Sequence, residues 1–514
     1  MACLLAVDAG TTGVRTLAFD ESGAVRAAAY RPLSTQFPRP GWVEQDPEEI
    51  WALVATTLAD AARMILGEGE TVAAIGLANQ RETAIAWDRK TGRPLHSAIV
   101  WQDRRTAARC EELTGAGLLP LVRDRTGLVL DPYFSATKFE WLLGDGGVDA
   151  GSHLALGTVD AWLLFCLTGG AVFATDVSNA SRTMLFDIRA RSWTPELCEA
   201  FAVPRDALPE VRPSCGRLGT VSSGGAPLGS LGIFPALRGV PISGAAGDQQ
   251  AALFGQVCDE PGMAKVTYGT GSFLLAHAGT SCPAPREGLL TTVAWDLDGH
   301  ELREGAGGLA YAFEGSTFVA GAAIQWLRDG LEVIERSEDL GPLAASVPDA
   351  GGVVVVPAFT GLGSPWWDPH ARGVVTGLTR GTGRGQLARA VVDAMAFGVR
   401  DMADAMTRAL RDETGSAITE LRADGGASAM DLLLQLQADQ LQLPVARPRC
   451  VECSALGAAM LAALAEGVWD ARERASRWEP DVRYVPRTNK ELADLEHAAW
   501  LRALDRSRSW ARPS

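Results

Sequence analysis

The stretch I-S-G-A-A-G-D-Q-Q-A-A-L-F-G, residues 242–255, joins an apolar, glycine-containing segment to one acid, two amides and an Ala/Leu/Phe run. This pattern predicts a helix that begins near Asp248. An acid in this place can be the N-cap, because Asp is among the favoured residues there. It can also be a general base that a rigid element delivers to a cleft. The stretch alone leaves both roles open.

The length and charge of the chain limit the classes of protein to which it can belong. Its 514 residues predict two or more domains, each large enough for a core of its own. The formal net charge of −15 argues against a non-specific nucleic-acid binder, which needs a basic face. An anionic ligand is not excluded, because backbone N–H groups can bind phosphate within an acidic protein. We therefore expect no nucleic-acid partner.

The cysteines, histidines and apolar runs indicate the compartment of the protein and whether a metal site or a membrane span is expected. Nine cysteines are scattered without disulfide-like spacing, which predicts a reducing, cytoplasmic compartment. Six dispersed histidines include no H-E-x-x-H, so we expect no tight metal site built from protein ligands. Nothing at the N-terminus resembles a signal peptide, and no uninterrupted apolar run reaches about 18 residues, so no membrane span is expected.

Two glycine- and threonine-rich hairpins are predicted, one in each half of the chain. The first has a strand at 3–8, a turn at 9–13 and a returning strand at 15–20. Its loop can offer N–H groups and hydroxyls to phosphate oxygens, and Asp8 can hold Mg²⁺ through water. The alternative is an ordinary glycine-rich hairpin. Residues 265–276 repeat this form, which suggests two halves of like fold that share one phosphate chain.

Polar and aromatic side chains at the ends of predicted elements indicate a second ligand. Arg81 and Glu82 fall between strands expected at 72–78 and 83–87. An adjacent cation and anion suit a ligand with several hydroxyls, although a solvated ion pair at a hairpin tip is the alternative. Trp101 and Tyr133 can likewise be core fillers or the walls of a site for a small polyol.

Several ordered blocks resemble the FGGY carbohydrate kinases from about residue 3 to about residue 485. The two signatures of that family are similar to Y-x-S-x-x-K-F-x-W-L at 133–142 and to the stretch from G-V-V-T-G-L at 373 to A-V-V-D at 393. The remaining blocks are P-G-W-V-E (40–44), N-Q-R-E-T (79–83), T-D-V-S-N-A-S-R-T (175–183), G-D-Q-Q-A-A-L-F-G-Q (247–256), Y-G-T-G (268–271), I-Q-W-L-R-D (324–329) and P-A-F-T-G-L-G (357–363).

The resemblance implies an α/β fold with two actin-like ATPase (ribonuclease H-like) domains around a deep cleft. Residues 1–250 would bind the polyol, phosphate and Mg²⁺, and residues 251–514 would bind the nucleotide. The implied reaction is ATP-dependent phosphorylation of glycerol to sn-glycerol 3-phosphate. Alternatives are another acceptor (erythritol, xylulose or gluconate) and a non-catalytic actin-like sensor. The family also suggests a homodimer or homotetramer.

The resemblance assigns site residues by position. It makes Asp248 the general base and implies a polyol site at Arg81, Glu82, Trp101, Tyr133, Asp248, Gln249 and Phe273. It places Asp8 near Mg²⁺, with water between them, and puts the phosphates and nucleotide at Thr11, Thr12, Gly13, Arg15, Thr270, Gly271, Gly321, Gln325, Gly426 and Ala427.

Three departures from the family pattern concern the first loop, the nucleotide site and the regulation of the protein. The first loop reads D-A-G-T-T-G-V-R, where the members that act on glycerol usually have Gln after the acid and Ser near the second glycine. Met430 stands where an Asn is common, which weakens any prediction of base selectivity. Some bacterial members bind fructose 1,6-bisphosphate at a glycine-rich loop containing Lys. Residues 224–227 (G-G-A-P) lack that Lys, so we expect this control to be absent or weak.

Overall fold

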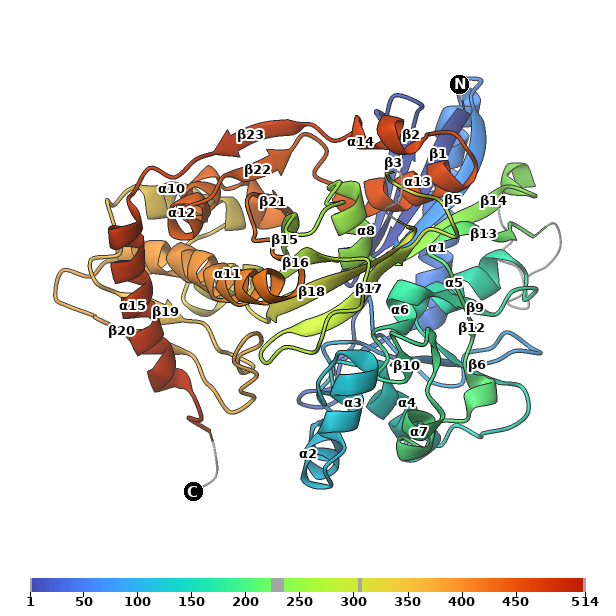
Figure 1. The fold of residues 1–514 in the computed structure, drawn as a ribbon, viewed down its shortest axis with the longest axis horizontal. Coiled ribbons are helices and arrows are strands. Elements are labelled where there is room, and N and C mark those ends of the chain that lie inside the picture. The colour runs from blue at the N-terminus through green and yellow to red at the C-terminus, as the bar shows by residue number, and fades with distance from the viewer. Residues whose placement is uncertain (1, 223–234, 304–306, 512–514) are drawn as a thin grey trace.

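The computed structural model describes residues 2–222, 235–303 and 307–511, and two sheets carry its architecture (Figure 1). Residues 224–227, from which we expect control by fructose 1,6-bisphosphate to be absent or weak, lie outside the described residues. The strands of the first sheet are β13 (Cys215–Thr220), β14 (Pro241–Gly247), β5 (Thr71–Asn79), β1 (Ala2–Ala9), β2 (Gly13–Phe19) and β3 (Val25–Pro32), in that order. The strands of the second are β17 (Leu290–Asp296), β18 (Leu309–Thr317), β16 (Ser272–Gly279), β15 (Ala264–Tyr268), β21 (Leu421–Asp424), β22 (Val445–Pro448) and β23 (Pro480–Tyr484).

The two sheets repeat one topology. In each, a run of three antiparallel strands (β1-β2-β3 or β15-β16-β18) is followed by two parallel neighbours (β5 and β14, or β21 and β22) and an antiparallel edge strand (β13 or β23). The second sheet adds β17 outside β18. The two like halves expected from the paired hairpins are therefore present. The division at residues 250 and 251 stays a prediction.

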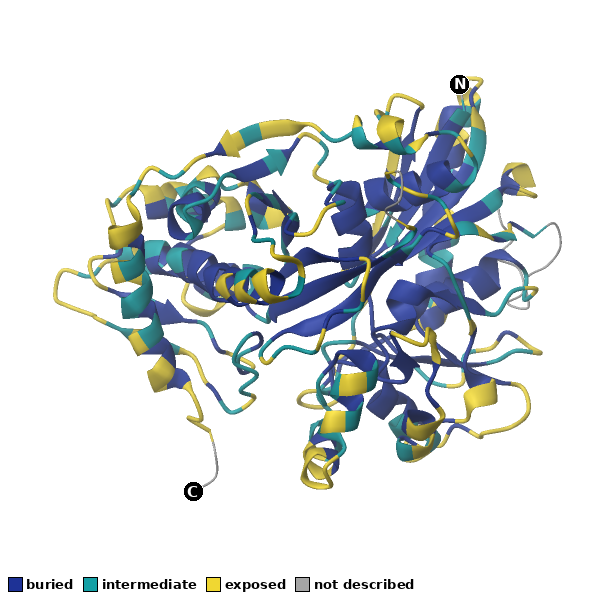
Figure 2. Cartoon of the chain, in the orientation of Figure 1, coloured by how far each residue is buried: buried dark blue, intermediate teal, exposed yellow. Residues whose placement is uncertain are grey.

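Helices cover the sheets and fill the space between them (Figure 2). The longer helices are α1 (Pro47–Gly67), α2 (Ala107–Gly115), α3 (Leu119–Thr126), α4 (Ser135–Leu143), α5 (Val159–Leu167), α8 (Asp248–Gly255), α11 (Arg384–Thr414), α12 (Asp431–Leu441), α13 (Cys453–Ala465) and α15 (Lys490–Ser507). The shorter ones are α6 (Val177–Ala180), α7 (Pro195–Ala200), α9 (Gly321–Gln325), α10 (Leu340–Ala345) and α14 (Ala471–Ala475). Short strands that bear on the site are β6 (Ile85–Asp88), β7 (Ala98–Ile99) and β9 (Ala174–Asp176).

Helix α1 begins as its sequence predicts, with Asp46 as N-cap and Pro47 in the first turn, and it ends at Gly67. Among the described residues it is the one helix long and apolar enough, by length and composition, to cross a membrane. Half of its most apolar stretch is buried, and the helix contacts β1, β2 and β3. These contacts are those of a core helix.

Helices α8 and α13 pack closely against each other at the centre of the molecule (Figure 1). A Cβ atom at Gly457 would lie 1.8 Å from the carbonyl oxygen of Ala251, so only glycine permits this approach. Helix α13 also covers β1, β5 and β14 of the first sheet. The small side chains of residues 453–465 thus allow a helix from the second half to lie on the first sheet, directly behind the start of α8.

Candidate active site

Two neighbouring parallel strands bring the predicted polyol residues together. Strands β5 and β14 pair in register so that Asn79 lies opposite Gly247, and each strand ends there. Arg81 and Glu82 follow the first strand and Asp248 follows the second, so all three meet at one edge of the sheet. Glu82 has φ +62°, a backbone conformation that is costly for a residue with a side chain and is concentrated at functional sites. The hairpin-tip interpretation of Arg81 and Glu82 is wrong, because both side chains are buried.

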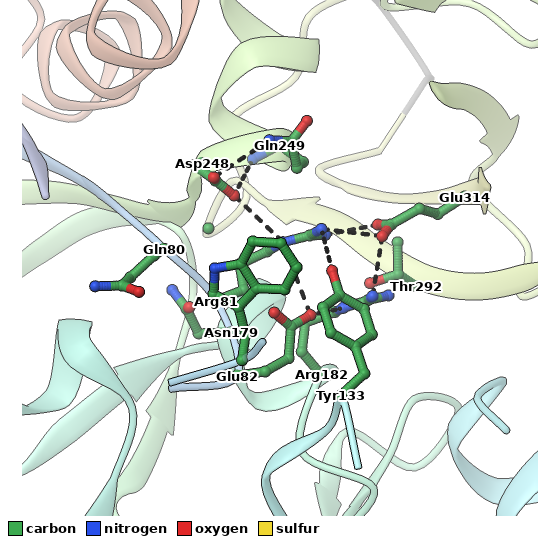
Figure 3. A network of polar contacts seen from close by, with 12 residues as sticks. Gln80, Arg81, Glu82, Tyr133, Asn179, Arg182, Asp248, Gln249, Thr292 and Glu314 are labelled. Carbon is green, nitrogen blue, oxygen red and sulfur yellow. Dashed lines mark hydrogen bonds and ion pairs between the residues drawn. The ribbon is translucent and has the colours of Figure 1, made fainter. Parts of the chain in front are cut away.

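The guanidinium of Arg81 is the centre of a buried set of charges (Figure 3). Its Nη1 and Nη2 bind Glu314 of β18 at 2.6 and 2.9 Å, and Nη2 donates to the hydroxyl of Tyr133 at 3.2 Å. Its Nε lies 3.3 Å from Oδ1 of Asp248. Arg182 joins the same set, because its Nε binds Glu82 at 2.7 Å and its Nη2 binds Glu314 at 2.9 Å. The set therefore ties the first sheet to the second.

The charges of this site sum to zero, and one of the charged side chains is partly exposed to solvent. We call Arg81, Glu82, Arg182, Asp248, Lys265 and Glu314 the charge network; it holds three cations and three anions. Five of its members are buried, whereas 28% of the Asp248 side chain is exposed. Burial raises the pKa of Glu82 despite Arg81 and Arg182. For Glu314 the same two cations outweigh burial and lower the pKa. Buried charges paired in this way resist rearrangement, because separating them leaves an uncompensated charge.

Three aromatic rings form a wall beside the charge network. Trp101, which follows β7, lies 5.6 Å from the ring of Tyr133 and 5.9 Å from that of Phe273 on β16, edge to face. The indole Nε1 of Trp101 donates to Oγ1 of Thr11 at 2.8 Å, which links this wall to the first hairpin. Lys138 holds Tyr133 in place, because its Nζ donates to the carbonyl oxygens of Pro132 and Tyr133 at 3.0 and 2.6 Å. The structure thus brings together the seven residues predicted for the polyol.

Asp248 is the first residue of α8, and the residue that precedes the helix is Gly247. The N-cap interpretation of Asp248 is therefore wrong. Gly247 has a φ of −57° with a ψ of 147°, and this ψ lies outside the helical range, as is typical of the capping position. Oδ1 of Asp248 accepts the backbone N–H of Gln249 at 2.7 Å, and Oδ2 accepts its side-chain amide at 3.2 Å. These contacts hold the carboxylate at the mouth of the helix, where it is partly exposed.

The first hairpin places its tip beside the same edge of the sheet, because Ala9 of β1 pairs with Asn79. Thr12 is exposed, and Gly13 lies in close contact with Tyr30. Arg15, predicted to contact phosphate, forms an ion pair with Glu452, the residue before α13. About a third of each of these two side chains is exposed. The predicted phosphate residues are thus near one another, with Arg15 already held by an acid.

Asp8 lies at the end of β1 among other carboxylates. Burial, followed by the nearby Asp248 and Glu452, raises the pKa of Asp8 to about 7. Within the described residues there is no group of three or more His, Cys, Asp or Glu side chains that could hold a metal ion. Mg²⁺ keeps several waters and takes one or two carboxylates besides substrate phosphates, so a partly buried carboxylate with other carboxylates nearby fits this ion.

A second cavity, of about 730 Å³, adjoins the second hairpin. Its lining includes five of the residues predicted for the nucleotide, Thr270, Gly321, Gln325, Gly426 and Ala427. Gly271, the next residue in the hairpin, is buried, and a Cβ there would lie 2.2 Å from the carbonyl oxygen of Thr317. Met430, which stands where the family commonly has an Asn, also lines the cavity, together with Ile324, Pro342 and Leu432. The cavity thus combines glycine loops with an apolar lining.

Sequence analysis missed the side chains that support the polyol residues. The block T-D-V-S-N-A-S-R-T received no role, yet it forms β9, α6 and the turn that carries Arg182. Its Asn179 exchanges two hydrogen bonds with Asn79, and Ser178 Oγ accepts the N–H of Gly247 at 3.0 Å. The polar residues of this block could have indicated a supporting role in the site. Glu314 gave no such signal, because it stands within an apolar strand.

The whole chain is similar to known carbohydrate kinases. Residues 3–255 match the N-terminal domain of the FGGY family of carbohydrate kinases, and residues 264–466 match its C-terminal domain. The chain is 50% identical over 519 residues to a glycerol kinase of Trichlorobacter lovleyi, with 100% of both chains covered. It is 48% identical over 518 residues to a glycerol kinase of Halorhodospira halophila, covering 99% of this chain and 97% of that protein. The crystal structure of Plasmodium falciparum glycerol kinase with ADP matches with a TM-score of 0.86 at 30% identity, covering 99% and 98% of the two chains. The chain therefore belongs to the FGGY family of carbohydrate kinases.

Proposed function

We propose that this kinase transfers the terminal phosphoryl group of ATP to glycerol and releases sn-glycerol 3-phosphate and ADP. The observation that carries the proposal is the position of Asp248. It is the one partly exposed carboxylate of the charge network, and Arg81 links it to Tyr133 of the aromatic wall, because this guanidinium contacts both residues (Figure 3). The full-length similarity to glycerol kinases supports the same reaction.

In the proposed reaction Asp248 is the general base. A terminal hydroxyl of glycerol gives its proton to Asp248 as its oxygen bonds to the γ-phosphorus, and the bond from that phosphorus to the β,γ-bridging oxygen breaks. Phosphoryl transfer has a loose transition state, so positioning and charge neutralisation supply most of the rate enhancement. Bound at Asp8 through water, Mg²⁺ would neutralise part of the phosphate charge. Backbone N–H groups and hydroxyls of the two hairpins would steady the phosphates.

The polyol site suits a short acceptor with hydroxyls on one side. Arg81, Glu82 and Gln249 would bind hydroxyls, while Trp101 and Phe273 would cover C–H groups. The exclusion of water by the cleft would limit hydrolysis of ATP. For the nucleotide we propose the cavity beside Thr270, with Gly271, Gly321, Gln325, Gly426 and Ala427 around it.

Location and assembly are further proposals. A reducing, cytoplasmic compartment is supported by the nine cysteines, all of which are free thiols. A homodimer or homotetramer remains an expectation from the resemblance. Light scattering of the purified protein would test it.

The direct test is product formation. Purified enzyme with ATP, Mg²⁺ and glycerol should release ADP and sn-glycerol 3-phosphate in equal amounts, as measured by ³¹P NMR and a stereospecific dehydrogenase assay. Reactions without glycerol or without Mg²⁺ are the controls. ADP release that does not depend on an acceptor would indicate an ATPase, and ATP binding without turnover would indicate a sensor.

A further inference from the structure

Lys265 is a completely buried cation behind the polyol site, and the mechanism above gives it no role. It lies on β15 and is one of four lysines in a chain with 47 basic residues. Its Nζ donates to Oε1 of Gln249 at 2.5 Å and to Oγ1 of Thr267 at 2.8 Å. A buried ammonium group needs nearby anions to offset its lost hydration, and both of these partners are neutral.

Charged groups from several elements face Lys265. Burial has the largest effect on its pKa and lowers it, and Arg81 acts in the same direction. Asp424 at the end of β21, Asp248 at the start of α8 and Glu314 on β18 act in the opposite direction. Lys265 is therefore within electrostatic range of both the proposed base and Asp424, the carboxylate that immediately precedes the glycine loop of the nucleotide cavity.

The contact with Lys265 decides which way the amide of Gln249 faces. An ammonium group has three donors and no acceptor, so only the carbonyl oxygen of the amide can face it. The amide nitrogen then faces away from the lysine, and it lies 3.2 Å from Oδ2 of Asp248 (Figure 3). If the amide turned round, its oxygen would face a carboxylate, and two acceptors would repel each other.

We propose that Lys265 is a positioning residue, which holds the Gln249 amide with its NH₂ group toward Asp248 and the acceptor hydroxyl. The inference rests on the proposed function, because it names a residue that acts on glycerol through Gln249. Loss of the cation removes one of the two groups that orient the amide, so its NH₂ group is held less firmly as a donor in the polyol site. Glycerol binding then weakens, while ATP binding does not change.

A double-mutant cycle on the full-length enzyme tests this role. The variants are Lys265→Met, Gln249→Ala and the two together, and the measurements are kcat and the KM values for glycerol and ATP. We expect Lys265→Met to raise the KM for glycerol about 10- to 100-fold, the range of a hydrogen bond to a charged group. The KM for ATP should stay within about threefold. The double variant should match Gln249→Ala alone, and additive losses would overturn the proposal.

Two further variants separate positioning from general support of the fold. Thr267→Val removes the other partner of Lys265 and should leave the KM for glycerol within about threefold of wild type. A loss equal to that of Lys265→Met would mean that the lysine only supports β15, which would overturn the proposal. Lys265→Arg keeps a donor-only cation and serves if the methionine variant does not fold. It should bind glycerol more tightly than Gln249→Ala does, and a KM at or above that of Gln249→Ala would also contradict the positioning role.

Wild-type enzyme in the same assays separates this inference from the proposed function. No ADP release with glycerol or with any other acceptor would refute the function itself. An active wild type with additive losses in the cycle would refute only the role of Lys265.

Discussion

At the proposed polyol end of the site, five charged side chains are buried and ion pairs join four of them, whereas the proposed nucleotide end is a cavity of about 730 Å³ lined by glycine loops and apolar residues. Paired buried charges hold their positions, so we propose that selectivity at the polyol end comes from fixed side chains. Glycine loops contribute backbone groups, which tolerate changes in neighbouring side chains. The comparison explains why the departures from the family pattern at the first loop and at Met430 fall on the phosphate and nucleotide side, while all seven polyol positions match.

Asp248 and Asp431 allow a direct test of this comparison, because each is the first residue of a helix. Asp248 lies at the polyol end, and Asp431 lines the cavity at the nucleotide end. Asp248→Asn should reduce kcat by about 10²- to 10⁴-fold, the range for loss of a general base. Its KM for glycerol should change little. Asp431→Asn should leave kcat within about threefold, because 74% of its side chain is exposed and its ion pair with Arg447 contributes little. Steady-state kinetics of both variants check this, and similar losses would break the comparison.

Glu314→Gln should have the next largest effect. Glu314 neutralises both Arg81 and Arg182, so its loss leaves buried positive charge uncompensated. We expect a loss of about 3 kcal/mol in the free energy of unfolding and a raised KM for glycerol, with the KM for ATP unchanged.

The matched control for Glu314 is Glu338→Gln. Glu338 lines the nucleotide cavity, and 67% of its side chain is exposed. Urea unfolding and kinetics should find this variant close to wild type. A Glu314→Gln enzyme as stable as wild type would mean that the charge network does not hold the polyol end rigid.

The pH dependence of stability tests the support of Tyr133. Burial lowers the pKa of Lys138 from 10.5 to about 8, so the folded chain binds fewer protons than the unfolded chain between these values. The contribution of Lys138 to stability therefore rises with pH across this window, by up to about 3 kcal/mol. Lys138→Met should lose this rise, whereas Lys490→Met, at a position that is 73% exposed, should keep it. Unfolding curves from pH 7 to 10 measure the difference, and parallel curves for all three proteins would contradict it.

The smallest effect is expected at Met430. This residue is half-buried in the nucleotide cavity and packs near Gly341. Met430→Ala removes part of an apolar lining, which should raise the KM for ATP by about three- to fivefold. The KM for glycerol should not change. A rise above about 50-fold would show that this side chain, rather than the loops, holds the nucleotide.

Local sequence patterns predicted those parts of the site that are formed by residues close to one another in the sequence. The two hairpins and the connection that carries Arg81 and Glu82 are of this kind. The role of Asp248 was left open by its own stretch, because Gly247 and Asp248 can each precede a helix. Glu314 lies 233 residues from Arg81, and Arg182 lies 100 residues from Glu82. Contacts over such distances are set by the packing of the two sheets, which no local pattern records.

The measurement that tests the central claim most directly is kcat/KM across a set of acceptors. The set is glycerol, erythritol, xylulose and gluconate, each with saturating ATP and Mg²⁺. A polyol site fixed by buried charges and closed by Trp101, Tyr133 and Phe273 predicts that glycerol gives by far the highest value. A higher value for a longer polyol or a sugar would mean that these rings do not limit the acceptor, and it would contradict the account of the polyol end.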